Sequence, residues 1–173
     1  MKEEQSSKPN SITFGEASMN NELIQTQLYA LKLENPRRHI FNELAPTWDT
    51  YSIVTAEKAQ AIREFVTALA LSDSSSVLDI GCGTGVLVPY IAEQLGEHGT
   101  YIGIDVSEKM IAEAQQKYSD SRFTFIAQDI YHYNERTQSF DAIILYQAFP
   151  HLHDKDTAVA IFKKLIKKGG RLC

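Results

Sequence analysis

The chain has 173 residues, a formal net charge of -5 and an apolar share of 43%. This length suits one ordinary domain with a hydrophobic core and excludes two full ones. The acidic balance disfavours a nucleic-acid-binding protein, because neutralising phosphates requires an excess of lysine and arginine. The sequence shows neither a signal peptide nor an apolar run that could span a membrane, and two cysteines define no disulfide framework, so we expect a cytoplasmic protein. The oligomeric state stays open.

Residues 1–71 are expected to precede the main sheet. Residues 1–36 predict a polar, partly helical extension, with a mobile lead-in over 1–20 and a short helix over 21–34. Residues 37–173 are expected to form the domain. Aromatic residues at 41, 48 and 51 predict a packed cap over residues 37–51, and residues 55–71 carry the spacing of an amphipathic helix.

From residue 77 onward, strand and helix patterns alternate. Strands are predicted at 77–80, 100–105, 123–127 and 140–145; helices are predicted over 87–95, after Ser107 and over 156–168; a fifth strand is predicted to begin at 171. This alternation predicts an α/β fold, a doubly wound and mainly parallel sheet flanked by helices. A ligand of such a sheet binds at the carboxyl ends of the strands, where the strand order reverses.

A glycine-rich loop follows the first predicted strand. It reads Asp79-Ile80-Gly81-Cys82-Gly83-Thr84-Gly85, and its third glycine comes one residue too early for the dinucleotide fingerprint. The acid beside the loop would repel a pyrophosphate and favour an ammonium group. These features favour S-adenosylmethionine, which carries an amino group, a carboxylate and a sulfonium. A nicotinamide dehydrogenase is disfavoured because Val86 stands where the third glycine of its fingerprint belongs.

A second acid, Asp105, ends the second predicted strand, where a carboxylate accepts both ribose hydroxyls of a nucleotide. The alternative is that Asp105 only helps to cap the next helix, although Ser107 already suits that role.

Residues 77–85 resemble the first motif of the class I, Rossmann-like S-adenosylmethionine-dependent methyltransferases, in particular those of metabolite and quinone biosynthesis. The resemblance covers roughly residues 37–173. It implies S-adenosyl-L-methionine as the cofactor and the following cofactor-binding residues: Asp79, Gly81, Cys82, Gly83, Gly85, Asp105, Val106, Met110, Asp129, Ile130 and Tyr146. Within that set, the resemblance places Val106, Met110 and Ile130 at the adenine ring and Asp129 at its exocyclic amine. The alternative for Asp129 is an acid that merely opens a turn.

The acceptor side is expected in the loop after the fourth strand. His151 and His153 are candidate catalytic bases, because histidine is the side chain most often used for proton transfer near neutral pH. Relatives often carry histidines here without a catalytic role, and the alternative for His153 with Asp154 is that they open the next helix. The His-x-His-Asp pattern alone lacks the ligands to close a metal site, so no metal is expected.

The sequence therefore predicts a methyltransferase that acts on a small-molecule acceptor by in-line displacement. Class I enzymes continue past the fifth strand into a further helix and a hairpin, whereas this chain is expected to stop within that strand. The alternative is accordingly a non-catalytic module, or inactive fragment, that binds S-adenosylmethionine or S-adenosylhomocysteine. The acceptor itself cannot be read from the sequence.

Overall fold

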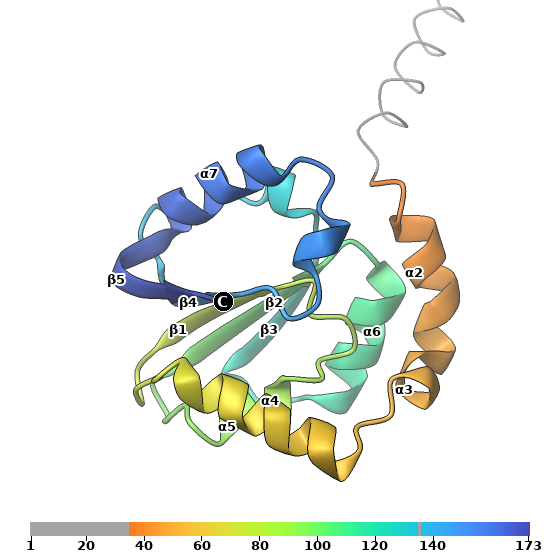
Figure 1. Ribbon diagram of the computed structural model, residues 1–173, viewed down its shortest axis with the longest axis horizontal. Coiled ribbons are helices and arrows are strands. Elements are labelled where there is room, and N and C mark those ends of the chain that lie inside the picture. Colours follow the sequence, from red (N-terminus) through yellow and green to blue (C-terminus); the bar gives the residue numbers. More distant parts are fainter. Residues whose placement is uncertain (1–34, 135) are drawn as a thin grey trace, which may run out of the picture. The chain divides into compact units, whose positions relative to one another are not determined.

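Five parallel strands form one sheet in the order β3-β2-β1-β4-β5 in the computed structural model, which describes residues 35–134 and 136–173 (Figure 1). The strands are β1 (Ser76–Ile80), β2 (Thr100–Asp105), β3 (Phe123–Ala127), β4 (Phe140–Ile144) and β5 (Ile166–Leu172). Every neighbouring pair is parallel. The strand order reverses between β1 and β4, which confirms the predicted doubly wound, Rossmann-like sheet.

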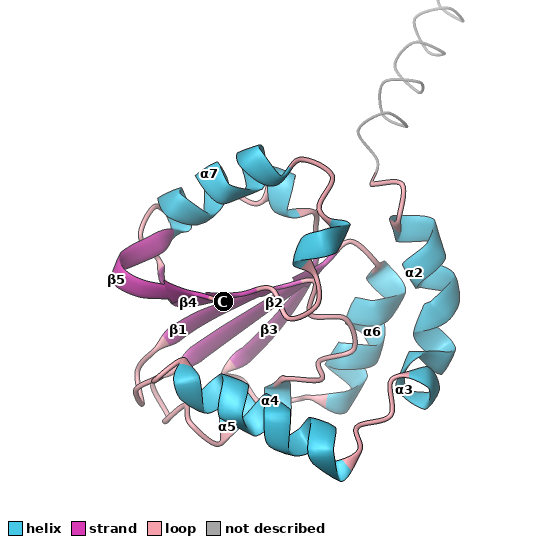
Figure 2. Cartoon of the chain, viewed as in Figure 1, coloured by secondary structure: helices cyan, strands magenta, loops and turns pink. Residues whose placement is uncertain are grey.

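Helices cover both faces of the sheet (Figure 2). The helical elements are α2 (Arg38–Leu44), η1 (Ala45–Thr47), α3 (Trp48–Tyr51), α4 (Ala56–Ala68), α5 (Val88–Ala92), α6 (Glu108–Lys117), η2 (Ile130–His132), η3 (Phe149–His151) and α7 (Lys155–Leu165). Buried side chains of α4, α5 and α6 pack on one face together with Val77, and buried side chains of α7 pack on the other face together with Leu78. Adjacent residues of β1 thus point to opposite layers, as a strand buried on both sides requires.

The longer helices begin at side chains that accept a backbone N–H. Thr55 accepts from Lys58 at the start of α4, and Ser107 accepts from Met110 at the start of α6. Each bond satisfies one of the four N–H groups that a helix N-terminus leaves without an intrahelical partner. These starts agree with the helix positions predicted from the sequence.

The junction between α7 and β5 differs from the prediction. The helix was expected to run to residue 168 and the strand to begin at 171, but α7 ends at Leu165 and β5 begins at once with Ile166, which pairs with Phe140. Gly169, with a φ of +82°, and Gly170 lie inside the strand, where the register shifts by a bulge. Pairing with the open edge of β4 therefore outweighs the helix propensity of the lysines that follow Leu165.

One predicted helix is shorter in the structure, and another predicted segment lies outside the described residues. Helix α5 spans only Val88–Ala92, shorter than the predicted 87–95. The predicted lead-in and the helix over 21–34 lie outside the described residues, whereas Pro36–Cys173 forms one compact unit. In that described part, no helix combines the length and the apolar character that crossing a membrane requires.

Candidate functional site

The loop that leaves β1 is held against β2 by its own backbone. The N–H groups of Gly81 and Cys82 both donate to the carbonyl oxygen of Ile104, at 2.8 and 3.1 Å. All three glycines of the loop have a positive φ, of +72° at Gly81, +55° at Gly83 and +86° at Gly85. Side-chain-bearing residues adopt this conformation only at a cost, which explains the choice of glycine.

The three glycines meet different surroundings. A Cβ at Gly81 would lie 2.6 Å from the Cβ of Ala148, and a Cβ at Gly85 would lie 2.6 Å from the ring of Tyr118. At Gly83 the nearest atom would be the indole nitrogen of Trp48, at 3.9 Å. Packing therefore disfavours a side chain at Gly81 and Gly85, whereas at Gly83 a Cβ would make only ordinary contact with Trp48.

Three backbone donors between β1 and α5 are unused. The N–H groups of Thr84, Val86 and Leu87 have no acceptor among the residues that the structure describes. Thr84 is itself buried. A buried N–H without a partner is uncommon in proteins, and an anionic ligand group such as a carboxylate would satisfy it.

Asp79 lies in β1 just before the loop and is almost fully buried, with 2% of its surface exposed. The hydroxyl of Tyr101 donates to its Oδ2 at 2.8 Å. Burial raises the pKa of Asp79 to about 7, opposed by this hydrogen bond and supported by the nearby charge of Asp105. A cationic ligand group at this position would favour the ionised form.

Asp105, at the end of β2, joins two loops. Its Oδ2 accepts the N–H of Gly83 at 3.0 Å and its Oδ1 accepts the N–H of Ser107 at 2.9 Å. Burial raises the pKa of Asp105, against the lowering effect of these backbone donors. The backbone of Val106 also favours the ionised carboxylate, and since a carboxylate has about four acceptor positions, capacity remains for a ligand. The alternative that Asp105 helps to cap the next helix is therefore partly correct. Asp105 holds the turn before α6, while the hydroxyl of Ser107 caps the helix.

Cys82 fills the space between the loop and β2. Its sulfur would lie 2.8 Å from a Cβ placed on Gly103. Burial raises the pKa of the Cys82 thiol well above its ordinary value. The side chain is therefore a neutral packing residue, without the thiolate that nucleophilic chemistry needs.

The residues expected around the adenine lie at the ends of β2 and β3. Val106 is half-buried, and Met110 on α6 is buried. Asp129 caps η2 by accepting the N–H of Tyr131 at 3.2 Å, so the turn-opening alternative describes what its side chain does here. Ile130 is buried in the core cluster on the α7 face. Contact of these residues with adenine stays a prediction.

The predicted N-terminal cap lies over the glycine loop. The hydroxyl of Thr84 donates to Oδ1 of Asp49 at 2.6 Å, and the ammonium of Lys117 forms an ion pair with Oδ2 of Asp49. Partial burial opposes ionisation of Asp49, but the bonds from Lys117 and Thr84 outweigh it and lower the pKa of this carboxyl. Asp49 thus attaches the cap to the loop. Its pairing with Lys117 could not be predicted from sequence spacing, because 68 residues separate the two.

The two candidate bases occupy different surroundings. His151 lies edge-on to Phe41 of α2, with 5.8 Å between ring centres, and its Nδ1 is 2.9 Å from the guanidinium of Arg37. His153 packs on Tyr131, with 4.2 Å between ring centres. The histidines therefore do not form one cluster. In residues 35–134 and 136–173, no group of three or more His, Cys, Asp or Glu side chains is arranged to hold a metal ion.

Tyr146 follows β4 and packs on Phe65 of α4, with ring centres 5.5 Å apart. The next residue, Gln147, has a φ of +60°, an unusual conformation for a residue with a side chain and one often found at functional sites. Asn42 of α2 is a further residue that the sequence did not single out. It bonds to Ser107 and Lys109 across 65 and 67 residues, and no local pattern signals such a contact.

The donors and acceptors of this site fit S-adenosylmethionine. Asp79 suits a cationic group, the N–H groups of Thr84 and Val86 suit a carboxylate, and Asp105 suits ribose hydroxyls. The set offers a partner of the correct polarity to the amino, carboxyl and sugar groups of that molecule.

Comparisons with known proteins agree with this geometry. The family model described as a methyltransferase domain matches residues 77–170, more than half of the chain. Phosphoethanolamine N-methyltransferase 1 of Zea mays is 32% identical over 121 residues, which are 69% of this chain and 24% of that protein. Demethylmenaquinone methyltransferase of Chlamydia felis is 36% identical over 94 residues, which are 54% of this chain and 40% of that protein.

A solved structure shows the same fold. The methyltransferase from Geobacter sulfurreducens in complex with S-adenosyl-L-homocysteine superposes with a TM-score of 0.56 at 22% identity, over 68% of this chain and 47% of that one. The chain spans less than half the length of each of these relatives.

Proposed function

The chain belongs to the class I S-adenosylmethionine-dependent methyltransferase family, and we propose that it binds S-adenosylmethionine at the carboxyl ends of β1 and β2 and methylates a small-molecule acceptor by in-line displacement. The observation that carries the proposal is the carboxylate of Asp105, which is held by the N–H of Gly83 from the glycine loop. This bond joins the proposed ribose ligand to the loop proposed to receive the amino-acid end of the cofactor.

The chemistry required of the protein is alignment more than proton transfer. The cofactor, when bound, supplies a methyl group on a positively charged sulfur, which needs no further activation. Asp79 faces the cationic end of the cofactor, Asp105 orients the sugar, and the cap that carries Trp48 and Asp49 contacts the loop. Holding the reactants in register without solvent is the main contribution that such a reaction needs.

His151 is proposed to orient the acceptor. Arginine has donors and no acceptors, so the contact with Arg37 requires Nδ1 of His151 to be the unprotonated nitrogen. In that tautomer Nε2 carries the proton and is available to donate to the acceptor. A catalytic role for His153 finds less support, because its ring packs on Tyr131 and η2.

A small molecule is the proposed acceptor class. The net charge of -5 disfavours a polyanionic RNA or DNA acceptor. Two relatives are named for phosphoethanolamine and demethylmenaquinone, both small molecules.

Isothermal titration with S-adenosylmethionine, S-adenosylhomocysteine and NAD tests the cofactor. We expect both sulfur nucleosides to bind and NAD, the matched nucleotide control, to show no heat. Binding of NAD alone would overturn the proposal. Incubation with radiolabelled S-adenosylmethionine and a metabolite extract then tests transfer: labelled product supports an enzyme, whereas cofactor binding without any product supports the non-catalytic module.

A further inference from the structure

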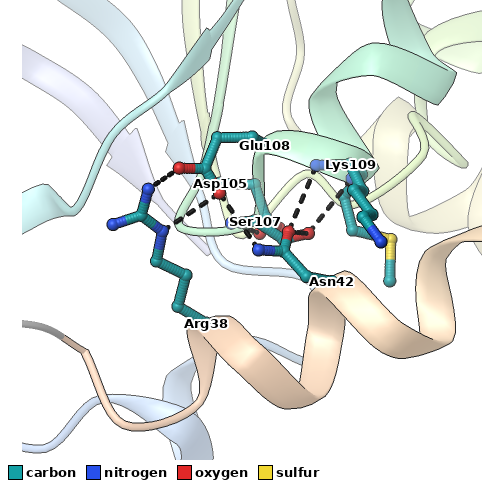
Figure 3. Close-up of polar contacts among 7 residues, drawn as sticks. Arg38, Asn42, Asp105, Ser107, Glu108 and Lys109 are labelled. Carbon is teal, nitrogen blue, oxygen red and sulfur yellow. Dashed lines mark hydrogen bonds and ion pairs between the residues drawn. The ribbon is translucent and has the colours of Figure 1, made fainter.

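The amide side chain of Asn42 on α2 bonds to the N-terminus of α6, beside the ion pair between Arg38 and Glu108 (Figure 3). Oδ1 of Asn42 accepts the hydroxyl of Ser107 at 2.7 Å and the backbone N–H of Lys109 at 3.2 Å. Its Nδ2 donates to Oε2 of Glu108 at 3.1 Å. Asn42 therefore contacts three consecutive residues of the turn that opens α6.

The same turn also orients the carboxylate of Asp105. The N–H of Ser107 donates to Oδ1 of Asp105 at 2.9 Å, while the hydroxyl of Ser107 donates to Asn42 and accepts from the N–H of Met110. Ser107 is completely buried, so water does not replace a lost partner without rearrangement. Any movement of Ser107 that follows the loss of Asn42 also moves one of the backbone donors that orient Asp105.

We propose that Asn42 is a positioning residue for the cofactor, which holds the turn after β2 so that Asp105 presents its free acceptor positions to the ribose hydroxyls. The inference rests on the proposed function, because it requires Asp105 to bind the sugar. It also couples two events: docking of α2 favours cofactor binding, and cofactor binding favours docking of α2.

The test is a double-mutant cycle on S-adenosylhomocysteine affinity, with wild type, Asn42→Ala, Asp105→Asn and the double variant. We expect Asn42→Ala to weaken binding about tenfold in the wild-type background, the equivalent of about 1.4 kcal/mol. In the Asp105→Asn background the same substitution should weaken binding less than about twofold, since the group through which it acts has changed. Glu43→Gln is the matched control: Glu43 follows Asn42 on α2 but contacts His39 of the same helix, so the variant changes the charge of α2 and leaves the turn that opens α6 intact, and it should leave the affinity within about twofold.

A second measurement keeps the inference testable if Asp105→Asn binds too weakly for titration. Hydrogen exchange of the backbone amides in residues 38–51 should slow when S-adenosylhomocysteine binds wild type, and this protection should be lost in Asn42→Ala at saturating ligand. A purely structural role would not remove ligand-dependent protection.

The outcomes separate the inference from the function. Equal losses in both backgrounds, or unchanged affinity and protection in Asn42→Ala, would overturn the role of Asn42 while wild-type binding still supports the proposed function. Wild type that fails to bind S-adenosylhomocysteine would overturn both.

Discussion

Replacing Asp79 with asparagine should stabilise the cofactor-free protein at alkaline pH. The side chain is 2% exposed and accepts the hydroxyl of Tyr101, and burial raises its pKa from the ordinary 3.8 to about 7. Asparagine keeps the size of the side chain and the oxygen that Tyr101 needs, but it never carries a charge. The variant therefore mimics the protonated acid at every pH.

The sign follows from where the proton is held. The unfolded chain releases the Asp79 proton near pH 3.8, whereas the folded chain keeps it until about pH 7. The folded state binds more protons between these values, so its stability falls as the pH rises through that window. Comparing the two titrations gives a loss of about 2–3 kcal/mol between pH 5 and pH 8 from this group, which Asp79→Asn should abolish.

Urea unfolding without cofactor, followed by circular dichroism at pH 5 and pH 8, measures this effect. The relevant quantity is the change with pH in the stability difference between the two proteins, because other titrating groups affect both alike. The variant should gain on wild type as the pH rises, and its affinity for S-adenosylmethionine should fall because the anion near the cationic groups is gone. A stability difference independent of pH would refute the reasoning, since Asp79 would then ionise in the folded chain at no cost.

Two further substitutions probe the loop and its acid. Asp105→Ala should weaken S-adenosylhomocysteine binding by about 30- to 100-fold, as expected for hydrogen bonds to a charged group, and unchanged affinity in a titration would remove the ribose assignment. Gly81→Ala should lower the free energy of unfolding by about 2 kcal/mol or more, because its Cβ would lie 2.6 Å from Ala148 at a φ of +72°. Gly169→Ala is its matched control, because Gly169 has a φ of +82° and open space around the Cβ. This variant should lower the free energy of unfolding by about 1 kcal/mol. Equal urea midpoints for the two variants would show that the contact with Ala148 is unimportant.

The sheet could be predicted because its signals are local. The short apolar runs that became β1 to β4 and the capping residue Ser107 each lie within a few residues of the element they specify. The start of β5 could not be predicted in the same way. Residues 163–168 are mostly lysines that suit a helix or an exposed strand, and only pairing with β4 decides between the two.

The candidate site was likewise predictable only where its signals are local in the sequence. The positions of the glycine loop and of Asp105 follow from their places at the ends of adjacent strands, so the sequence was sufficient for them. The contact of Asn42 with Ser107 was not predictable, since it joins distant segments through a polar side chain without any repeating pattern. Likewise, the two histidines after β4 differ in sequence position by two residues, and only the structure separates the ring at Arg37 from the ring at Tyr131.

The chain has a single tryptophan, Trp48, and its indole stands beside the most open glycine of the loop. Its emission is therefore an intrinsic optical reporter of whatever arrives at that backbone, with no dye or label attached. Phe41, edge-on to the same indole, makes the signal sensitive to displacement of α2 as well. Stopped-flow fluorescence therefore follows ligand arrival and any displacement of the cap in one experiment on the unmodified protein.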